Sequence, residues 1–418
     1  MIALLLIFIK SNIKTIIKFE LKFSMLITDL DLNNKKVLVR VDFNVPMNRK
    51  LNVTDNTRIK SSKKTILHIL RNGGTCILLS HMGRPNGYEK KLSLKNIVGE
   101  VEEVLNKKIT FLNDCVGAKV KKTCEESKKG DIILLENLRF YFDEEAGEIE
   151  FARALSELGD IYINDAFGTA HRNHASTGIL PTFFKGSKAM GFLLSSEVNA
   201  IEKVLKNGQT PILSIIGGAK VSSKIEILKN LIDIVDDIII GGGMAYTFIK
   251  ANGGQVGNSL CEEAFLDEAK NILLLAKNKN TKVHLPNDVV VSESFSNNSP
   301  TDRVNIYNIP KHMQGLDIGP LTIKKFDKII LNSKTILWNG PLGVFEMTNF
   351  QNGTKQIAVS IVKATKGGAF SLVGGGDSIS AIKLFGMDDK FSYISTGGGA
   401  MLESIEGKVL PGIEAILN

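Results

Sequence analysis

The chain has 418 residues, which exceeds what one ordinary hydrophobic core holds, so we expect two domains of similar size. Apolar residues make up 43% and charged residues 23% of the chain, a balance typical of soluble α/β proteins. The net charge of +8 suits anionic small molecules as readily as nucleic acid, but one Trp, six Tyr and no interleaving of basic with aromatic residues argue against nucleic-acid binding.

The first 24 residues are the first segment to interpret. The run MIALLLIFIK is apolar for eight residues after its Met, which is too short to span a bilayer, and it lacks a basic n-region and a small-residue cleavage site. We therefore interpret residues 1–24 as an extension that activity does not need, and we expect globular structure from Met25 onward. Loss of activity on removing residues 1–24 would contradict this interpretation.

Apolar runs alternate with amphipathic stretches of helical period from residue 35 onward. This βαβ pattern predicts doubly wound parallel sheets of the Rossmann-like class. The stretch 56–74 is predicted to be a helix that ends at a glycine cap. We assign residues 25–190 to a first domain, and its expected strands are KKVLVRVDFN, GTCILLS, KITFL, DIILLEN and DIYINDA.

A helical pattern over residues 191–207 precedes a new strand and is the predicted hinge helix between the domains. The second domain, residues 208–402, differs in its turns, because five apolar strands run into glycine-rich turns and helices. These segments are LSIIGGAK, IIIGGGMA, ILWNGPLG, SLVGGGDS and SYISTGGGA.

Four cysteines are scattered along the chain without C-x-x-C spacing. They are Cys76, Cys115, Cys124 and Cys261. Unpaired thiols of this kind are typical of a reducing compartment, so we expect a cytoplasmic protein.

Arginines gather near the predicted strand ends of the first half, and ligands of open α/β sheets bind outside the carboxyl ends of the strands. The strand in RVDFNVP ends in Asp42 and Asn44, and polar residues that end a buried strand are expected to bond something. The cationic residues near these strand ends are His81, Arg84, Arg139, Arg172 and, at a helix start, Arg58. Since a guanidinium holds carboxylate or phosphate bidentately, the pattern predicts a site for a small, highly charged acid.

Bare glycines stand at the strand ends of the second half, where backbone N–H groups and helix N-termini can approach phosphates closely. In GGAKVSSK, Lys220 and Lys224 are four residues apart, and we predict that they share one face of a helix start and bind a phosphate that offsets their repulsion. Asp377 in GGGDS has two compatible interpretations, an N-cap and a Mg²⁺ ligand. Spacing leaves Glu346 open between a surface acid and an acceptor for ribose hydroxyls.

The segment YINDAFGTAHRNHAST, residues 162–177, allows a metal pair at His171 and His174, a kinase-like magnesium motif at D-A-F-G, or an anion clamp at Arg172. H-x-x-H alone is weak evidence for zinc, since no Cys or further His stands nearby in the sequence. The protein-kinase H-R-D loop, the G-x-G-x-x-G fingerprint and the G-x-x-x-x-G-K-[ST] loop are all missing. We favour Arg172 as the functional residue and His174 as structural, and the role of His171 stays open.

Nine motifs follow one another along the chain: RVDFNVP, SHMGRP, LENLRF, NDAFGTAHR, GGAKVSSK, GGGMAYTF, WNGPLGVFE, GGGDS and STGGGA. In this order they resemble the motifs of phosphoglycerate kinases, and the resemblance covers about residues 26–417. It implies a two-domain enzyme that moves the acyl phosphate of 1,3-bisphosphoglycerate to ADP, reversibly, yielding 3-phosphoglycerate and ATP in glycolysis. It also implies that residues 403–418 pack back on the first domain. Residues 1–24 have no counterpart, and Met82 and Ser378 stand where Leu and Thr are frequent.

The resemblance also implies site residues. The implied contacts of 3-phosphoglycerate are Asp42, Phe43, Asn44, Arg58, His81, Met82, Gly83, Arg84, Arg139 and Arg172. The implied nucleotide contacts are Gly218, Ala219, Lys224, Gly241, Gly242, Gly315, Asn339, Pro341, Glu346, Gly375, Gly376, Asp377 and Ser378. Arg58 and Lys220 would flank the transferring phosphoryl group, and Asp377 would reach the Mg²⁺ that accompanies ADP or ATP. The resemblance further implies a monomer that bends at the hinge.

The attacking oxygen, on ADP or on a carboxylate, is already ionised, so the reaction needs positioning and cations and no catalytic base. Two alternatives remain: a non-catalytic protein that keeps the fold, and a kinase of another small acid. Absence of Lys220, Arg58 or Asp377 would have favoured the first alternative, and all three residues are present.

Overall fold

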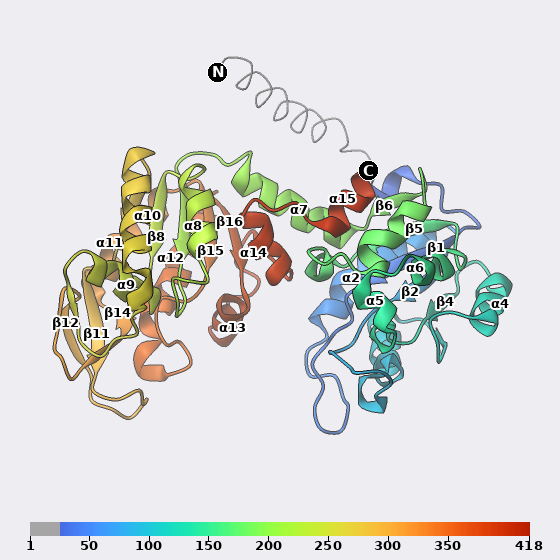
Figure 1. Cartoon of the computed structure of the whole chain (residues 1–418), viewed down its shortest axis with the longest axis horizontal. Helices are drawn as coiled ribbons and strands as arrows, with labels where there is room; N and C mark the ends of the chain where they lie inside the picture. The colour runs from blue at the N-terminus through green and yellow to red at the C-terminus, as the bar shows by residue number, and fades with distance from the viewer. Residues whose placement is uncertain (1–25) are drawn as a thin grey trace, which may run out of the picture. The chain divides into compact units, whose positions relative to one another are not determined.

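The computed structural model describes residues 26–418, which divide into two compact units (Figure 1). Unit 1 extends to Glu197 and includes Val409–Asn418 at the end of the chain, and unit 2 is Val198–Lys408. The division falls inside helix α7 (Phe192–Leu205), within the segment that the sequence predicts as a hinge. The interpretation of residues 1–24 concerns a segment outside the described residues.

Unit 1 is built on a parallel sheet with the strand order β3-β4-β2-β1-β5-β6. All five strands expected from the sequence are present, and β6 is an additional edge strand. Strand β1 lies between β2 and β5, so the strand order changes direction between β1 and β5. Ligands of such sheets bind at this switch point, outside the carboxyl ends of the two strands. The strands are β1 (Lys36–Val41), β2 (Thr75–Leu79), β3 (Thr110–Phe111), β4 (Ile132–Leu134), β5 (Ile161–Asp165) and β6 (Lys188–Met190).

One face of β1 forms the centre of the unit 1 core. Val37, Val39 and Val41 are buried together with Ile59 and Ile66 of α2, as the alternation in the sequence predicts. The helices of this unit besides α7 are α2 (Thr57–Arg71), α3 (Val98–Leu105), α4 (Ala118–Glu126), α5 (Phe142–Ala146), α6 (Ile149–Ser156) and α15 (Pro411–Leu417), with a π-helix at Ala175–Ile179.

Helix α2 ends at the predicted glycine cap. Gly73 has φ +83°, its N–H donates to the carbonyl of Leu70, and Gly74 N–H donates to the carbonyl of Ile69. These two bonds are those of a Schellman motif, in which the left-handed residue is most easily a glycine.

The end of the chain returns to unit 1. Gly412 N–H donates to the carbonyl of Ala170 at 2.8 Å, and the Asn164 amide donates to the carbonyl of Gly412 at 3.2 Å. In Figure 1 the red helix α15 accordingly lies beside the green elements around β6. The returning segment of unit 1 begins at Val409, whereas the resemblance suggested a start at residue 403.

Unit 2 contains a second parallel sheet, with the order β10-β8-β7-β15-β16-β17. Its strands are β7 (Ile212–Ile216), β8 (Asp237–Ile240), β10 (Lys282–His284), β15 (Thr335–Asn339), β16 (Phe370–Gly374) and β17 (Tyr393–Ile394). Its helices are α8 (Ile225–Ile232), α9 (Met244–Ala251), α10 (Leu266–Asn278), α11 (Pro320–Asn332), α12 (Asn352–Lys366), α13 (Gly376–Leu384) and α14 (Gly399–Ile405). The two parallel sheets confirm the predicted doubly wound class.

Unit 2 also contains strand pairs that the sequence analysis did not predict. One is an antiparallel sheet with the order β12-β11-β14, formed by Asp302–Asn305, Asp288–Ser292 and Gln314–Ile318. The other pairs β9 (Gln255–Val256) with β13 (Asn308–Ile309). Strand β12 is DRVN and mostly exposed, and the parallel strand β10 is KVH, so neither has the continuous apolar run by which the other strands were predicted. Within residues 26–418, no helix is both long enough and apolar enough to cross a bilayer.

Candidate active site

The arginine cluster of unit 1 is built around Asp42, the residue that follows β1. Arg58 Nη1 donates to Asp42 Oδ1 at 3.1 Å and to the carbonyl of Asn44 at 3.0 Å, and it lies 3.0 Å from Asp42 Oδ2. Asp42 is buried, whereas 38% of the Arg58 side chain is exposed. The carboxylate therefore orients a guanidinium that is still open to a ligand.

Gly83 is held from two sides. Asn44 Oδ1 accepts from Gly83 N–H at 3.0 Å, and Arg139 Nη1 donates to the carbonyl of Gly83 at 2.6 Å. With φ +64°, Gly83 has a conformation that a side chain would strain. These bonds join the SHMGRP loop to the end of β1 and to the buried Arg139.

Asn137 is a residue of this region that the sequence analysis missed. It is completely buried, and its Oδ1 accepts from the backbone N–H groups of Met82 at 3.0 Å and Arg139 at 3.1 Å. Its Nδ2 donates to the carbonyls of Met82 at 2.8 Å and Leu92 at 3.0 Å. The signal was available, because Asn137 follows a buried strand in LENLRF just as Asn44 follows β1.

Four guanidiniums act on His81, which is almost fully buried. Burial is the main cause that lowers the pKa of His81 well below 6.5, and nearby positive charges lower it further. The charges are those of Arg40, Arg139, Arg58 and Arg172. Three of the predicted arginines therefore lie near enough to His81 to affect its pKa, together with Arg40, which the sequence analysis did not select.

The remaining predicted acid-site residues differ in their surroundings. Phe43 and Met82 are buried in the unit 1 core, so their side chains face away from solvent. Arg84 is exposed and Arg172 is half-buried. Phe43 N–H donates to Ser80 Oγ at 2.9 Å, which fixes the backbone after β1.

The loop after β5 places its two histidines differently. His174 is buried, with Nδ1 4.0 Å from Glu144 Oε1, and burial followed by nearby arginines lowers its pKa to about 4. His171 is half-buried, and Arg172 receives a hydrogen bond at its carbonyl from Thr177 Oγ1 at 2.8 Å. Within the described residues, no group of three or more His, Cys, Asp or Glu side chains is placed to hold a metal ion.

A polar chain connects three strand ends in unit 2. Lys224 Nζ donates to Asn339 Oδ1 at 2.7 Å, and Asn339 Nδ2 donates to the carbonyl of Gly374 at 2.9 Å. Gly340 N–H donates to Ser378 Oγ at 2.6 Å. Gly217 N–H, directly after β7, donates to the carbonyl of Asn339 at 2.9 Å. The ends of β7, β15 and β16 therefore meet, in agreement with the rule for parallel sheets.

The helical spacing predicted for Lys220 and Lys224 is wrong. Helix α8 begins at Ile225, Lys224 is its N-cap with φ −127°, and Lys220 lies in the preceding turn. The turn persists because Ser222 gives both its N–H and its hydroxyl to the Glu262 carboxylate, at 2.9 and 2.7 Å. Lys224 is therefore half-buried against Asn339, while Lys220 is exposed.

Asp377 is not an N-cap, contrary to one of its two interpretations. Gly375 is the N-cap residue of α13, and Asp377 lies in the first helical turn with its side chain exposed. Its charge raises the pKa of the Lys224 ammonium against the larger lowering by burial. Asp377 therefore lies near enough to Lys224 to act on its charge.

The predicted glycines fall into two groups. A Cβ on Gly242 would lie 2.7 Å from the carbonyl oxygen of Gly218, and a Cβ on Gly315 would lie 2.1 Å from Tyr246 Oη, so the packing of the protein itself requires these glycines. A Cβ on Gly218 or Gly376 would meet nothing within 4 Å. At Gly218 φ is +118°, which disfavours a side chain, whereas at Gly376 neither the backbone conformation nor the packing of the protein requires a glycine.

Other predicted nucleotide contacts surround this turn. Gly218 N–H donates to the carbonyl of Pro341 at 3.0 Å, and Gly241 packs on Leu342. Ala219 and Glu346 are exposed. The sequence analysis missed Leu260, whose side chain is 47% exposed although it lies against Gly243 of the same turn.

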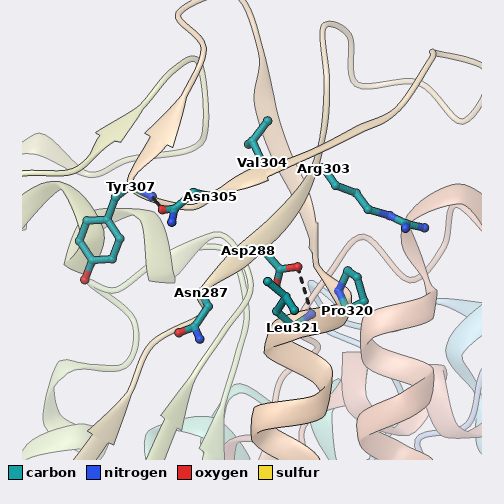
Figure 2. A pocket seen from close by; sticks show the side chains of 8 residues that line it. All are labelled: Asn287, Asp288, Arg303, Val304, Asn305, Tyr307, Pro320 and Leu321. Atoms are coloured by element: carbon teal, nitrogen blue, oxygen red, sulfur yellow. Dashed lines mark hydrogen bonds between the residues drawn. The ribbon is translucent and has the colours of Figure 1, made fainter.

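A pocket of about 550 Å³ lies elsewhere in unit 2, between the β11–β12 pair and the start of α11 (Figure 2). None of the predicted site residues lines it. Its buried carboxylate, Asp288, is engaged by Leu321 N–H at 3.1 Å and Thr322 N–H at 2.7 Å, and Figure 2 shows Arg303 and Tyr307 directed away from it. Since its polar groups do not converge, we leave this pocket out of the candidate site.

The comparisons with known proteins all point to one family. Residues 27–408 match the family model described as phosphoglycerate kinase. The phosphoglycerate kinase of Porphyromonas gingivalis is 46% identical over 94% of this chain and 100% of that protein, and that of Dictyoglomus turgidum is 46% identical over 93% and 97%. The solved phosphoglycerate kinase of Coxiella burnetii superposes with a TM-score of 0.87, at 39% identity, over 94% of this chain and 98% of that one.

Proposed function

The chain belongs to the phosphoglycerate kinase family, and from this premise we propose how its two sites divide the reaction. The protein is an enzyme, a kinase whose glycolytic reaction is the reversible phosphoryl transfer from 1,3-bisphosphoglycerate to ADP, which gives 3-phosphoglycerate and ATP. The observation that carries the proposal is the set of guanidiniums that surrounds His81 and Asp42 in unit 1, together with the open glycine turns of unit 2.

In unit 1, the proposed ligand is 3-phosphoglycerate. Arg139 and Arg172 would hold its anionic groups, since each guanidinium offers a planar pair of donors. The backbone N–H groups of Asn44 and Gly83 are already bonded, to Asp42 Oδ1 and to Asn44 Oδ1, so the Asn44 Nδ2 amide is the donor that would face the ligand. Arg58, which Asp42 orients and which is partly open, would face the phosphoryl group.

In unit 2, the proposed ligand is ADP or ATP. The turns at Gly218 and Gly376 leave room for phosphates where a Cβ would meet nothing of the protein. Lys224 would hold a phosphate oxygen, and the exposed Leu260 would offer an apolar surface to the base. Glu346, which is exposed, would accept hydrogen bonds from the ribose.

The residues around Asp377 fit a Mg²⁺ ion that arrives with the nucleotide. Mg²⁺ in such sites takes one or two carboxylates and otherwise phosphate oxygens and water. Asp377 supplies one exposed carboxylate at the start of α13, beside Lys224. When bound there, the ion would neutralise phosphate charge, while Lys220 and Arg58 would stabilise the equatorial oxygens of the transferring group.

We further propose that the units close during transfer, because the two ligand sites belong to different units and water must be kept from the acyl phosphate. The hinge would lie in residues 191–207. We also propose that the protein acts as a monomer in the cytoplasm and binds neither nucleic acid nor membranes. Its four free cysteines support the reducing compartment.

A coupled assay with 3-phosphoglycerate and ATP tests the reaction directly. We expect turnover that depends on both substrates and on Mg²⁺, and a large loss of turnover in Arg58→Met. Arg303→Met, which removes an arginine beside the separate pocket of unit 2, is the matched control and should retain activity. Preference for another small acid over 3-phosphoglycerate would support the alternative kinase, and absence of any turnover would support the non-catalytic alternative.

A further inference from the structure

Arg40 is a completely buried cation on β1. Its Nε donates to Ser176 Oγ at 2.8 Å, its Nη1 donates to the carbonyl of Val41 at 2.6 Å, and its Nη2 lies 3.3 Å from His81 Nδ1. Burying a guanidinium is unfavourable unless its N–H groups are bonded. Here one side chain connects the SHMGRP loop with the π-helix that follows Arg172.

The direction of each bond follows from the chemistry of arginine, which has only donors. Ser176 Oγ accepts from Arg40 and therefore directs its own hydrogen to Glu144 Oε1, 2.6 Å away. Glu144 Oε2 accepts from Ser176 N–H at 2.9 Å. Glu144 is also completely buried, so Ser176 links a cation and an acid that both lie away from water.

The bond from Arg40 also determines the proton position on His81. Because Arg40 Nη2 can only donate, His81 Nδ1 must accept, and a neutral imidazole then carries its single hydrogen on Nε2. Asp42 Oδ1 lies 4.0 Å from the same Nδ1, beyond hydrogen-bond distance, so it does not compete with Arg40 for this nitrogen.

We propose that Arg40, held by Ser176 and Glu144, is a positioning residue that fixes His81 as the neutral Nε2–H tautomer. His81 then offers one hydrogen-bond donor to the anionic acid of the proposed function, on which this step rests. A second consequence is that His81 stays neutral over the physiological pH range. The charged groups that face it are Arg40 of β1, Asp42 after β1, Arg58 of α2, Arg139 of the LENLRF segment and Arg172 after β5.

Nitrogen NMR of the ¹⁵N-labelled full chain tests the tautomer without any change near the ring. Long-range ¹H–¹⁵N correlations distinguish a protonated from an unprotonated ring nitrogen, and His81→Gln identifies the signals of His81 among the six histidines. We expect an unprotonated Nδ1 and a protonated Nε2 that do not change between about pH 5 and 8. A protonated Nδ1, or a ring that titrates in this range, would overturn the inference.

Two variants test whether Arg40 is the cause. In Arg40→Met we expect loss of the single tautomer and a rise of about ten-fold in KM for 3-phosphoglycerate, with KM for ATP nearly unchanged. Because this variant leaves Glu144 unpaired, the double variant Arg40→Met/Glu144→Gln removes both buried charges and should give the same His81 signals. Arg153→Met, an exposed arginine of α6, is the control and should change neither measurement.

The readouts separate this inference from the proposed function. Turnover of 3-phosphoglycerate with a titrating His81 would overturn the inference alone. A fixed Nε2–H tautomer that persists in both Arg40 variants would also overturn it, because Arg40 would then not be the cause. If another acid is the substrate, the tautomer result still decides the inference, and the change in KM is measured with that acid.

Discussion

Lys220 and Lys224 stand four residues apart, but their surroundings give them different roles. Lys224 is half-buried and bound to Asn339, whereas Lys220 is exposed in the turn before α8. The exposed ammonium of Lys220 has room to move with a phosphoryl group during transfer. The ammonium of Lys224 is held by Asn339 and is suited to binding a phosphate that stays in place. The prediction for Lys220 follows from this difference.

We expect Lys220→Ala to lower kcat about 100-fold or more while KM for ATP changes only a few-fold, because it removes charge stabilisation that acts mainly in the transition state. Initial rates at varied ATP and 3-phosphoglycerate measure both constants. Lys224→Ala is the comparison, and it should raise KM for ATP. Equal losses in kcat and in affinity would make Lys220 an ordinary binding residue.

Arg172 is the residue of the loop after β5 that we interpret as functional. Its replacement by lysine keeps the positive charge but removes the planar guanidinium, which can donate two parallel hydrogen bonds. We expect Arg172→Lys to weaken 3-phosphoglycerate binding about ten-fold, since one of two charge-assisted hydrogen bonds is lost. Titration calorimetry with the acid alone measures this affinity. Arg153→Lys on α6 is the control, and an unchanged affinity in Arg172→Lys would remove Arg172 from the site.

Asp165, which ends β5, gives a prediction for stability against pH. It is fully buried, its Oδ1 accepts from Leu193 and Leu194 N–H at the start of α7, and burial raises its pKa from 3.8 to about 7. The folded state therefore binds more protons than the unfolded state between about pH 4 and 7. Its contribution to the free energy of unfolding is lost as pH rises through this window.

Asp165→Asn, which does not titrate, isolates this contribution. We expect the free energy of unfolding of the original chain, relative to the variant, to fall with rising pH by at most about 1.4 kcal/mol per pH unit between about pH 4 and 7. Urea unfolding of both proteins at several pH values measures the difference. A difference that stays constant or grows with pH would show that the carboxyl is ionised throughout.

At the scale of elements, the sequence was informative where burial imposes a simple pattern. Most strands of the two parallel sheets read as apolar runs, with β6 and β10 (KVH) as the exceptions, and the end of α2 carries its glycine signal. The turn before α8 was misjudged because its hydrogen bonds go to Glu262, forty residues later in the chain, which no local pattern reveals. Strand β12 was missed because a mostly exposed strand has no apolar run.

The N-terminus of α13 provides a test at this scale. Gly376 is the first residue of the helix, and a Cβ there meets nothing within 4 Å. We expect Gly376→Ala to leave the free energy of unfolding unchanged or raised by up to about 1 kcal/mol, since alanine favours helix. KM for ATP should nevertheless rise several-fold, because the methyl group occupies space proposed for a phosphate.

Gly315→Ala is the contrasting variant, since its Cβ would collide with Tyr246 inside the protein. It should lower the free energy of unfolding by about 1–3 kcal/mol, the usual range for an overpacked core. Unfolding curves and ATP titrations on both variants check the contrast. If Gly376→Ala leaves KM for ATP unchanged, the space at the start of α13 is not a phosphate site.

At the scale of the whole molecule, length and the change in turn chemistry near residue 208 predicted two parallel α/β halves. The same patterns did not predict that α15 packs on unit 1. The hydrogen bonds of this contact join Gly412 with Ala170 and Asn164, which are more than half of the chain away in sequence. Likewise, Arg40 was passed over because a lone arginine inside a strand has no local signal. Its partners Ser176 and His81 come from distant segments.

The proposed acid and nucleotide sites belong to different units, and an acyl phosphate that remains in contact with water would hydrolyse. Both ligands should therefore favour a closed arrangement. We expect small-angle X-ray scattering to show a smaller radius of gyration with 3-phosphoglycerate and a non-transferable ATP analogue together than with neither. Either ligand alone should produce a smaller change, because it leaves one unit without its contacts. A scattering profile that both ligands together leave unchanged would contradict bending at residues 191–207, and transfer would then have to proceed without closure.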